Sequence, residues 1–138
     1  MKFSFETIVS VSSEKIWEYY SNTKKWYLWE DDLEDITIQN DNFITGNKGV
    51  MKLKNMPPMD FTLTSVIRHK EFIDVTQTPM GNITFGHFLI PTNKGTIVKH
   101  EVSLDNEREE NINILKGIFK DVPDSVFSLK KVVESYEL

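Results

Sequence analysis

The sequence predicts an α+β fold in which an antiparallel sheet of about six or seven strands is covered on one face by helices. Two observations support this fold class. Strand-like segments separated by turn residues fill most of the chain up to residue 104, and the last third changes to the three- or four-residue spacing of an amphipathic helix. The length of 138 residues is typical of one domain, so we expect a single domain over residues 1–138.

The first predicted strand lies at the N-terminus, where every second residue is apolar or β-branched. These residues are Phe3, Phe5, Thr7, Val9 and Val11. Ser12 and Ser13 follow, and their hydroxyls can cap the free N–H groups of a helix. Asn22 can cap a second short helix that carries Trp26 and Trp29. Two short helices are therefore expected after the first strand.

Further strands are predicted where β-branched and aromatic residues cluster between turns. They cover residues 36–38, 50–54, 60–68, 72–78, 83–90 and 96–104. Because the turns between the later strands are short, these strands should form a meander of hairpins. The acidic residues Glu30, Asp31, Asp32, Glu34 and Asp35 lack the spacing and the glycine of a calcium loop. We interpret them as a solvated loop and predict no metal site.

The C-terminal third predicts helices. Apolar residues recur at helical spacing from Ile112 to Phe119, and Pro123 suits the first turn of a new helix. Val126, Leu129, Val133 and Tyr136 then repeat every three or four residues. This stripe predicts a long amphipathic helix that covers an apolar surface.

Three stretches carry a resemblance to a known superfamily. They are residues 9–17 (VSVSSEKIW), residues 26–31 (WYLWED), and the pair formed by residues 95–100 (GTIVKH) and 129–134 (LKKVVE). Their order resembles the START-like (SRPBCC) superfamily, which includes the birch pollen allergen and bacterial polyketide cyclase/dehydrase-like proteins. The resemblance covers nearly the whole chain. The sequence departs from the common pattern of the superfamily at Ser13, where many relatives have proline. The resemblance implies the helix-grip fold, in which a curved sheet wraps around the C-terminal helix.

The resemblance also implies a cavity between that sheet and the last helix, which relatives use for lipids, polyketides and other apolar molecules. Binding of a small hydrophobic or amphipathic ligand is therefore the first functional hypothesis. The candidate lining residues are Trp26, Trp29, Phe61, Leu63, Phe85, Phe88, His100, Val126, Leu129 and Val133. Side chains of these types also form ordinary cores, so residue type alone does not separate lining from packing.

Two other functions are open at this level. His100 shares a strand face with Val98 and Val102, so it should point inward and could act as a general base in a cyclase/dehydrase-like enzyme, with Tyr136 as an acid. His87 alternates with Phe85 and Leu89, and the sequence indicates less clearly whether its side chain points inward. A protein-interaction module is the third possibility, because some relatives bind proteins and an acidic surface can steer a basic partner.

Composition excludes or disfavours several other kinds of site and function. The chain has no cysteine, which excludes disulfides, zinc–thiolate sites and a cysteine nucleophile. The net charge of −5 disfavours nucleic-acid binding. No apolar run is long enough for a membrane span and no signal peptide is visible, so we expect a cytoplasmic protein. No cofactor motif occurs, and the sequence does not indicate an oligomeric state.

Overall fold

A computed structural model describes residues 1–135 of the chain. Its elements, in order, are β1 (Lys2–Val9), α1 (Ser13–Ser21), the 3-10 helix η1 (Thr23–Leu28), β2 (Leu33–Ile38), the 3-10 turn η2 (Gln39–Asp41), β3 (Lys48–Leu53), β4 (Met59–Ile67), β5 (Glu71–Thr78), β6 (Gly81–Thr92), β7 (Gly95–Leu104), α2 (Glu109–Phe119) and α3 (Val122–Ser135). The predicted α+β class, with two short helices after the first strand, is confirmed.

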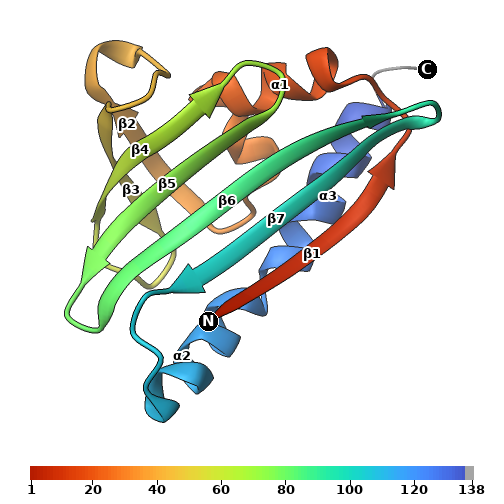
Figure 1. Cartoon of the computed structure of the whole chain (residues 1–138). Coiled ribbons are helices and arrows are strands. Elements are labelled where there is room, and N and C mark those ends of the chain that lie inside the picture. The colour runs from red at the N-terminus through yellow and green to blue at the C-terminus, as the bar shows by residue number, and fades with distance from the viewer. Residues whose placement is uncertain (136–138) are drawn as a thin grey trace.

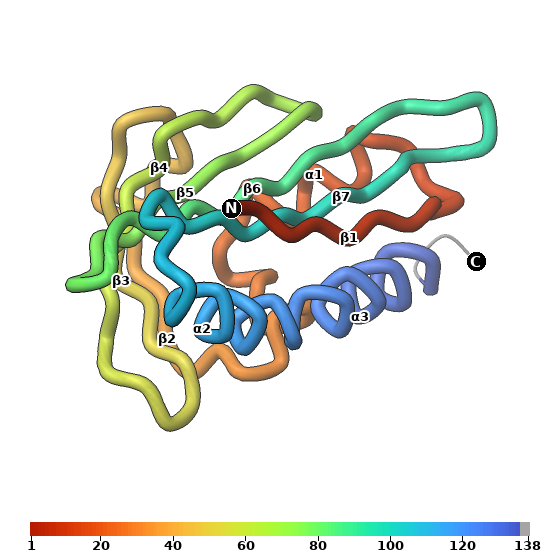
Figure 2. The backbone as a smooth tube through the Cα atoms, turned by 60° about the horizontal axis from the view of Figure 1, so that its bottom comes forward, coloured from red at the N-terminus to blue at the C-terminus, as the bar shows by residue number. Residues whose placement is uncertain are grey.

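The strands form one seven-stranded antiparallel sheet in the order β1-β7-β6-β5-β4-β3-β2. The first strand therefore pairs with the last, and Phe5 lies opposite His100. The register shifts between Leu63 and Ser65 in β4, an irregularity of the kind that bends a sheet. Figure 1 shows α3 crossing behind β7 and β1, and Figure 2 shows α3 and η1 on the same side of the sheet.

Several strand boundaries differ from the sequence prediction, among them the end of β1 and the start of β2. β1 ends at Val9, because the chain then leaves the ladder and the carbonyl of Val11 accepts a hydrogen bond from Thr96 Oγ1 at 2.7 Å. β2 begins at Leu33, inside the segment that we interpreted as a loop, because Leu33 pairs with Leu53 of β3. Tyr136 lies outside the described residues.

The core lies between the concave face of the sheet and the helices. α3 turns Val126, Leu129 and Val133 toward the sheet, and each is fully buried. Burial of side chains of this size contributes roughly 1.5–3 kcal/mol each. A second apolar cluster joins α2 to the other end of the sheet through Leu115, Val102 and neighbouring residues. Within residues 1–135 no helix has the length and hydropathy needed to cross a membrane.

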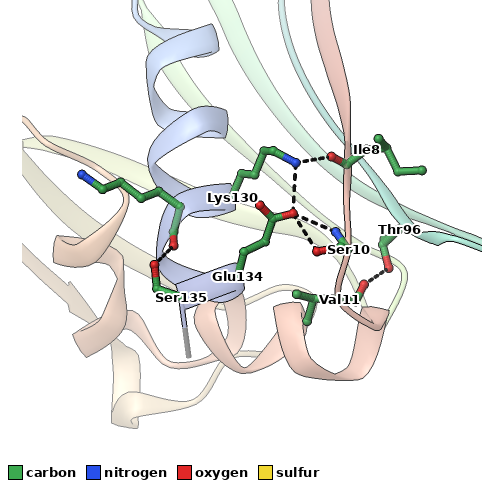
Figure 3. Close-up of polar contacts among 8 residues, drawn as sticks. Ile8, Ser10, Val11, Thr96, Lys130, Glu134 and Ser135 are labelled. Carbon is green, nitrogen blue, oxygen red and sulfur yellow. Dashed lines mark hydrogen bonds and ion pairs between the residues drawn. The ribbon is translucent and has the colours of Figure 1, made fainter. Parts of the chain in front are cut away.

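Polar contacts fasten α3 to the end of β1 (Figure 3). Glu134 Oε2 accepts hydrogen bonds from the backbone N and the Oγ of Ser10, at 2.9 and 3.0 Å. Lys130 Nζ donates to the Ile8 carbonyl at 2.7 Å and lies 3.0 Å from Glu134 Oε2. These contacts hold the C-terminal half of α3 in place over the sheet.

Candidate functional site: a polar cluster inside an aromatic core

The strand register brings four rings into a row on the concave face of the sheet. Phe72 of β5 pairs with His87 of β6, His87 pairs with His100 of β7, and His100 pairs with Phe5 of β1. The His87 ring stacks on Phe72 with a centroid distance of 3.8 Å, and it meets the His100 ring edge-on at 4.7 Å. Both histidines therefore face inward.

The segment that follows β1 covers this row of rings. Ser12 caps α1 by accepting a hydrogen bond from Lys15 N, and Asn22 caps η1 by accepting one from Lys24 N. Trp26 Nε1 donates to the Tyr20 carbonyl at 2.8 Å, and Trp29 Nε1 donates to the Tyr19 carbonyl at 3.0 Å. These bonds satisfy the polar ends of both indoles, so their rings can be buried against the sheet.

Tyr20 links α1 to the histidines. Its hydroxyl lies 2.7 Å from His100 Nε2, and both side chains are buried. Burial raises the pKa of Tyr20 well above its usual value, and the nearby Glu30 adds to the rise. Burial also lowers the pKa of His100 well below its usual value, with a further contribution from His87. Both side chains are therefore neutral, and a hydrogen bond joins the Tyr20 hydroxyl to His100 Nε2.

Asp74 of β5 is the carboxylic acid of this interior. The register places it between Leu63 and Phe85, and only 6% of the residue is exposed. Burial raises its pKa from 3.8 to about 8, and the negative charge of Glu30 adds to the rise. Its Oδ2 lies 4.0 Å from His87 Nδ1, too far for a hydrogen bond.

His87 does not neutralise Asp74. Its Nδ1 lies 3.2 Å from the Phe72 carbonyl, which can only accept, so Nδ1 carries the proton. Burial lowers the pKa of His87 to about 3, although the Phe72 carbonyl partly opposes this shift. A neutral imidazole offers Asp74 no positive charge.

Glu30 follows η1 and approaches the same interior. Burial raises its pKa to about 7, a hydrogen bond from Ser125 opposes the rise, and the neighbouring Asp31, Asp32 and Asp121 add to it. The residue is half-buried, so it lies between the interior and solvent. Its interpretation as part of a solvated acidic loop is therefore corrected. We call Tyr20, Glu30, Asp74, His87 and His100 the interior polar cluster.

The Asp74 carboxyl has no hydrogen-bond partner among residues 1–135. Every side-chain nitrogen or oxygen that is sealed from solvent in this part of the chain does have a partner. The oxygens of Asp74 are consequently not sealed, and 8% of its side chain remains accessible. A polar atom of water or of a ligand can reach this carboxyl. Within the same residues, no three His, Asp or Glu side chains are arranged to hold a metal ion.

Side chains occupy most of the space in which the sequence led us to expect an open cavity. Tyr20, Trp29, Leu63 and Leu129 are all at most 1% exposed. Two hollows on the described chain lie elsewhere. One, of about 390 Å³, is at the β6–β7 hairpin beside the start of α1, and the other, of about 300 Å³, is between η1 and the β2–β3 connection. A ligand between the sheet and α3 would therefore have to displace side chains.

The structure gathers most of the predicted lining residues but not all of them. One buried cluster contains Trp26, Trp29, Phe61, Leu63, Val126, Leu129 and Val133. His100 is 3% exposed and faces the same interior, as its strand alternation predicts. Phe85 also points inward, but it packs in the second cluster with the residues of α2.

Phe88 lies on the opposite, convex face of the sheet, so its assignment to the lining is corrected. It alternates with the inward His87, and its ring lies over Gly86, where an added Cβ would come within 2.7 Å of it. Phe88, Leu89 and Ile90 are consecutive apolar residues, so the sequence does not show which of them point inward. In the structure Leu89 points inward and both of its neighbours point outward. Phe88 is therefore not a candidate for an interior ligand site.

Comparison with known proteins agrees with this architecture. No family model and no curated protein matches the chain. Among solved structures, protein MLL2253 from Mesorhizobium loti superposes with a TM-score of 0.81 over 100% of both chains, at 17% sequence identity. The protein Ara h 8.0201 gives a TM-score of 0.70 at 12% identity, covering 98% of each chain.

A norcoclaurine synthase of Thalictrum gives a TM-score of 0.72 at 15% identity, covering 100% of this chain and 96% of that one. At such identities the likeness concerns the fold. The seven-stranded sheet, the paired short helices after β1 and the long α3 show that the chain has the helix-grip fold, which its resemblance to the START-like (SRPBCC) superfamily implied.

Proposed function

We propose that this protein binds a small amphipathic molecule between the concave face of the sheet and α3, with the polar group of the molecule at the interior polar cluster. The observation that carries the proposal is Asp74, a nine-tenths buried carboxyl with no hydrogen-bond partner among the described residues. A buried polar group without a partner costs roughly 1–3 kcal/mol. Such a cost commonly marks a functional site, because a ligand can supply the missing partner.

The apolar part of the ligand would lie among the aromatic rings. Trp26 and Trp29 belong to η1 and its end, a six-residue 3-10 segment. Segments of this kind have poorer hydrogen-bond geometry than α-helices, so η1 can be displaced at lower cost than α3. We expect the ligand to separate the two indole rings from Phe72, which the Trp26 ring stacks on at 5.4 Å.

The test is a binding titration with a neutral apolar dye, N-phenyl-1-naphthylamine, combined with amide chemical-shift mapping. We expect saturable binding, and shifts concentrated on β5, β6 and β7, on η1 and on the inward positions of α3. Phe88→Ala, on the convex face, is the matched control and should bind the dye like the wild type. Absence of saturable binding, or shifts confined to the convex face, would contradict the proposal.

A second candidate function is proton-transfer catalysis at the same cluster. The specific observation is that Asp74 and Glu30 have pKa values of about 8 and 7, the range in which a side chain exchanges protons efficiently near neutral pH. They suit this role better than His100, whose pKa is lowered and whose Nε2 is occupied by Tyr20.

Catalysis can be tested without a known substrate. In deuterated buffer, a ketone probe such as 2-heptanone should exchange its α-protons faster in the presence of the protein. Asp74→Asn and Glu30→Gln should each remove the acceleration, whereas Phe88→Ala should keep it. Exchange at the uncatalysed rate with the wild-type protein would exclude this candidate for ketones of that size.

A further inference from the structure

The charge balance of the interior polar cluster is one-sided. The cluster contains two carboxyl groups, Asp74 and Glu30, and the negative charge of Glu30 adds to the rise that burial causes in the pKa of Asp74. Among the buried residues of the described chain none is a lysine or an arginine. The basic nitrogen nearest to Asp74 is His87 Nδ1 at 4.0 Å, and His87 is neutral. Buried carboxylates are normally paired with a positive group, and here that group is missing from residues 1–135.

Aromatic rings surround His87, the residue whose Nδ1 lies 4.0 Å from the Asp74 carboxyl. Phe72 stacks on His87, and the Trp29 ring lies 6.2 Å from His87 and 5.5 Å from Tyr20. The face of an aromatic ring attracts a cation within about 6 Å, and rings around a buried site commonly bind organic ammonium groups. The same rings offer nothing to a second carboxylate, which Glu30 and its acidic neighbours Asp31 and Asp32 would repel.

We propose that the interior polar cluster binds the ammonium group of a small amphipathic amine, with Asp74 as its counter-ion. This inference rests on the proposed function, since it names the chemical class of the ligand at that site. The amine nitrogen supplies the partner that Asp74 lacks, and its apolar chain lies between the sheet and α3. The groups facing the nitrogen are Tyr20 from α1, Glu30 after η1, Asp74 from β5, His87 from β6 and His100 from β7.

Binding of the cation has a proton balance that can be measured. Free Asp74 holds its proton near neutral pH because burial raises its pKa. An adjacent ammonium group favours the carboxylate, so this proton leaves Asp74 for the buffer as the complex forms. The ammonium group keeps its own proton. Net release of up to about one proton per bound amine is expected near pH 7, decreasing above about pH 8.

The test compares three probes with the same six-carbon chain: hexylamine, 1-hexanol and hexanoate. Each is titrated into the full-length protein at pH 7 by calorimetry in two buffers of different ionisation enthalpy. We expect the amine to bind at least about tenfold more tightly than the alcohol, the carboxylate to bind most weakly, and only the amine to release protons.

Two variants make the result specific to Asp74. Asp74→Asn should lower the affinity for hexylamine to that for 1-hexanol and abolish proton release, while leaving the alcohol affinity within about twofold. Asp60→Asn, at an exposed position on β4, is the matched control and should behave like the wild type. If Asp74→Asn does not fold, Glu30→Gln takes its place and should reduce the preference for the amine.

The outcomes separate this inference from the function on which it rests. Equal binding of all three probes, or proton release that Asp74→Asn does not change, overturns the ammonium site and leaves ligand binding intact. Failure of all three probes and of N-phenyl-1-naphthylamine to bind the wild-type protein overturns both.

Discussion

Replacing Asp74 by asparagine should make the protein more stable at neutral pH, by an amount that grows with pH. Asparagine keeps the shape of the protonated side chain but does not ionise. In the wild type, the folded-state pKa of Asp74 is about 8, against 3.8 for an exposed aspartate. The folded protein thus holds this proton more tightly than the unfolded chain does, and the stability contributed by the protonated carboxyl is lost as the pH rises between these two values.

The magnitude follows from the width of that window. One pKa unit corresponds to about 1.4 kcal/mol, so the penalty reaches roughly 4 kcal/mol at about pH 7 and is close to zero near pH 4. The buried histidines shift in the opposite direction, since their pKa values are lowered and their stability contribution rises with pH. For this reason the quantity to compare is the difference in unfolding free energy between Asp74→Asn and the wild type at each pH.

The assay is urea unfolding followed by tryptophan fluorescence, because Trp26 and Trp29 are buried in the folded protein. We expect the difference to rise from near zero at about pH 4 to several kcal/mol at about pH 7. The exposed Asp60→Asn variant should show no such trend. A difference that stays constant across this range would refute the assignment of a protonated, buried Asp74.

Three further variants test other parts of the structure by the same unfolding assay. Tyr20→Phe removes the hydrogen bond to His100 and should cost about 1 kcal/mol or somewhat more; no loss would mean that the 2.7 Å contact is not formed in solution. Leu129→Ala opens a void beneath α3 and should cost about 2–5 kcal/mol, whereas a loss below about 1 kcal/mol would show that α3 does not cover the sheet. Glu134→Gln weakens the attachment of α3 to Ser10 and should cost about 0.5–1.5 kcal/mol at neutral pH. Because the pKa of Glu134 is lowered, mainly through its hydrogen bonds with Ser10 and Lys130 against the effect of burial, this loss should disappear as acid protonates the wild-type carboxyl.

The architecture was accessible from the sequence because its signals are periodic. Alternation along β7 predicted that His100 points inward, and the spacing of Val126, Leu129 and Val133 predicted the buried face of α3. Both patterns repeat over several turns or strand pairs, so one ambiguous residue does not change the outcome. The caps at Ser12 and Asn22 are local in sequence, and both form as expected.

The interior polar cluster could not be predicted from the sequence in the same way. In β5, Ile73 and Val75 lie on the outward face, and Phe72 and Asp74 lie on the inward face. Because Ile73 and Val75 are apolar and β-branched, alternation alone would place them inward and would turn Asp74 outward. Glu30 stands in an acidic run, and nothing in that run shows that only its first member turns inward. The pairing of His87 with His100 depends on the hairpin register, in which Thr92 pairs with Gly95. A two-residue turn at Asn93-Lys94 gives this register, and our placement of the loop over residues 91–95 was too wide to find it.

The position of β1 has a consequence for how the chain folds. Among residues 1–135, β1 forms an edge of the sheet, and its partner β7 begins at Gly95, long after β1 has been synthesised. During translation the N-terminal strand must wait for that partner with its backbone groups exposed, a state that favours aggregation and chaperone capture. Such distant pairing also slows folding, because the intervening chain must be ordered before the ladder closes. A circular permutant that places residues 2–9 directly after residue 104 would make this pairing local, and refolding should then be faster than in the natural chain order.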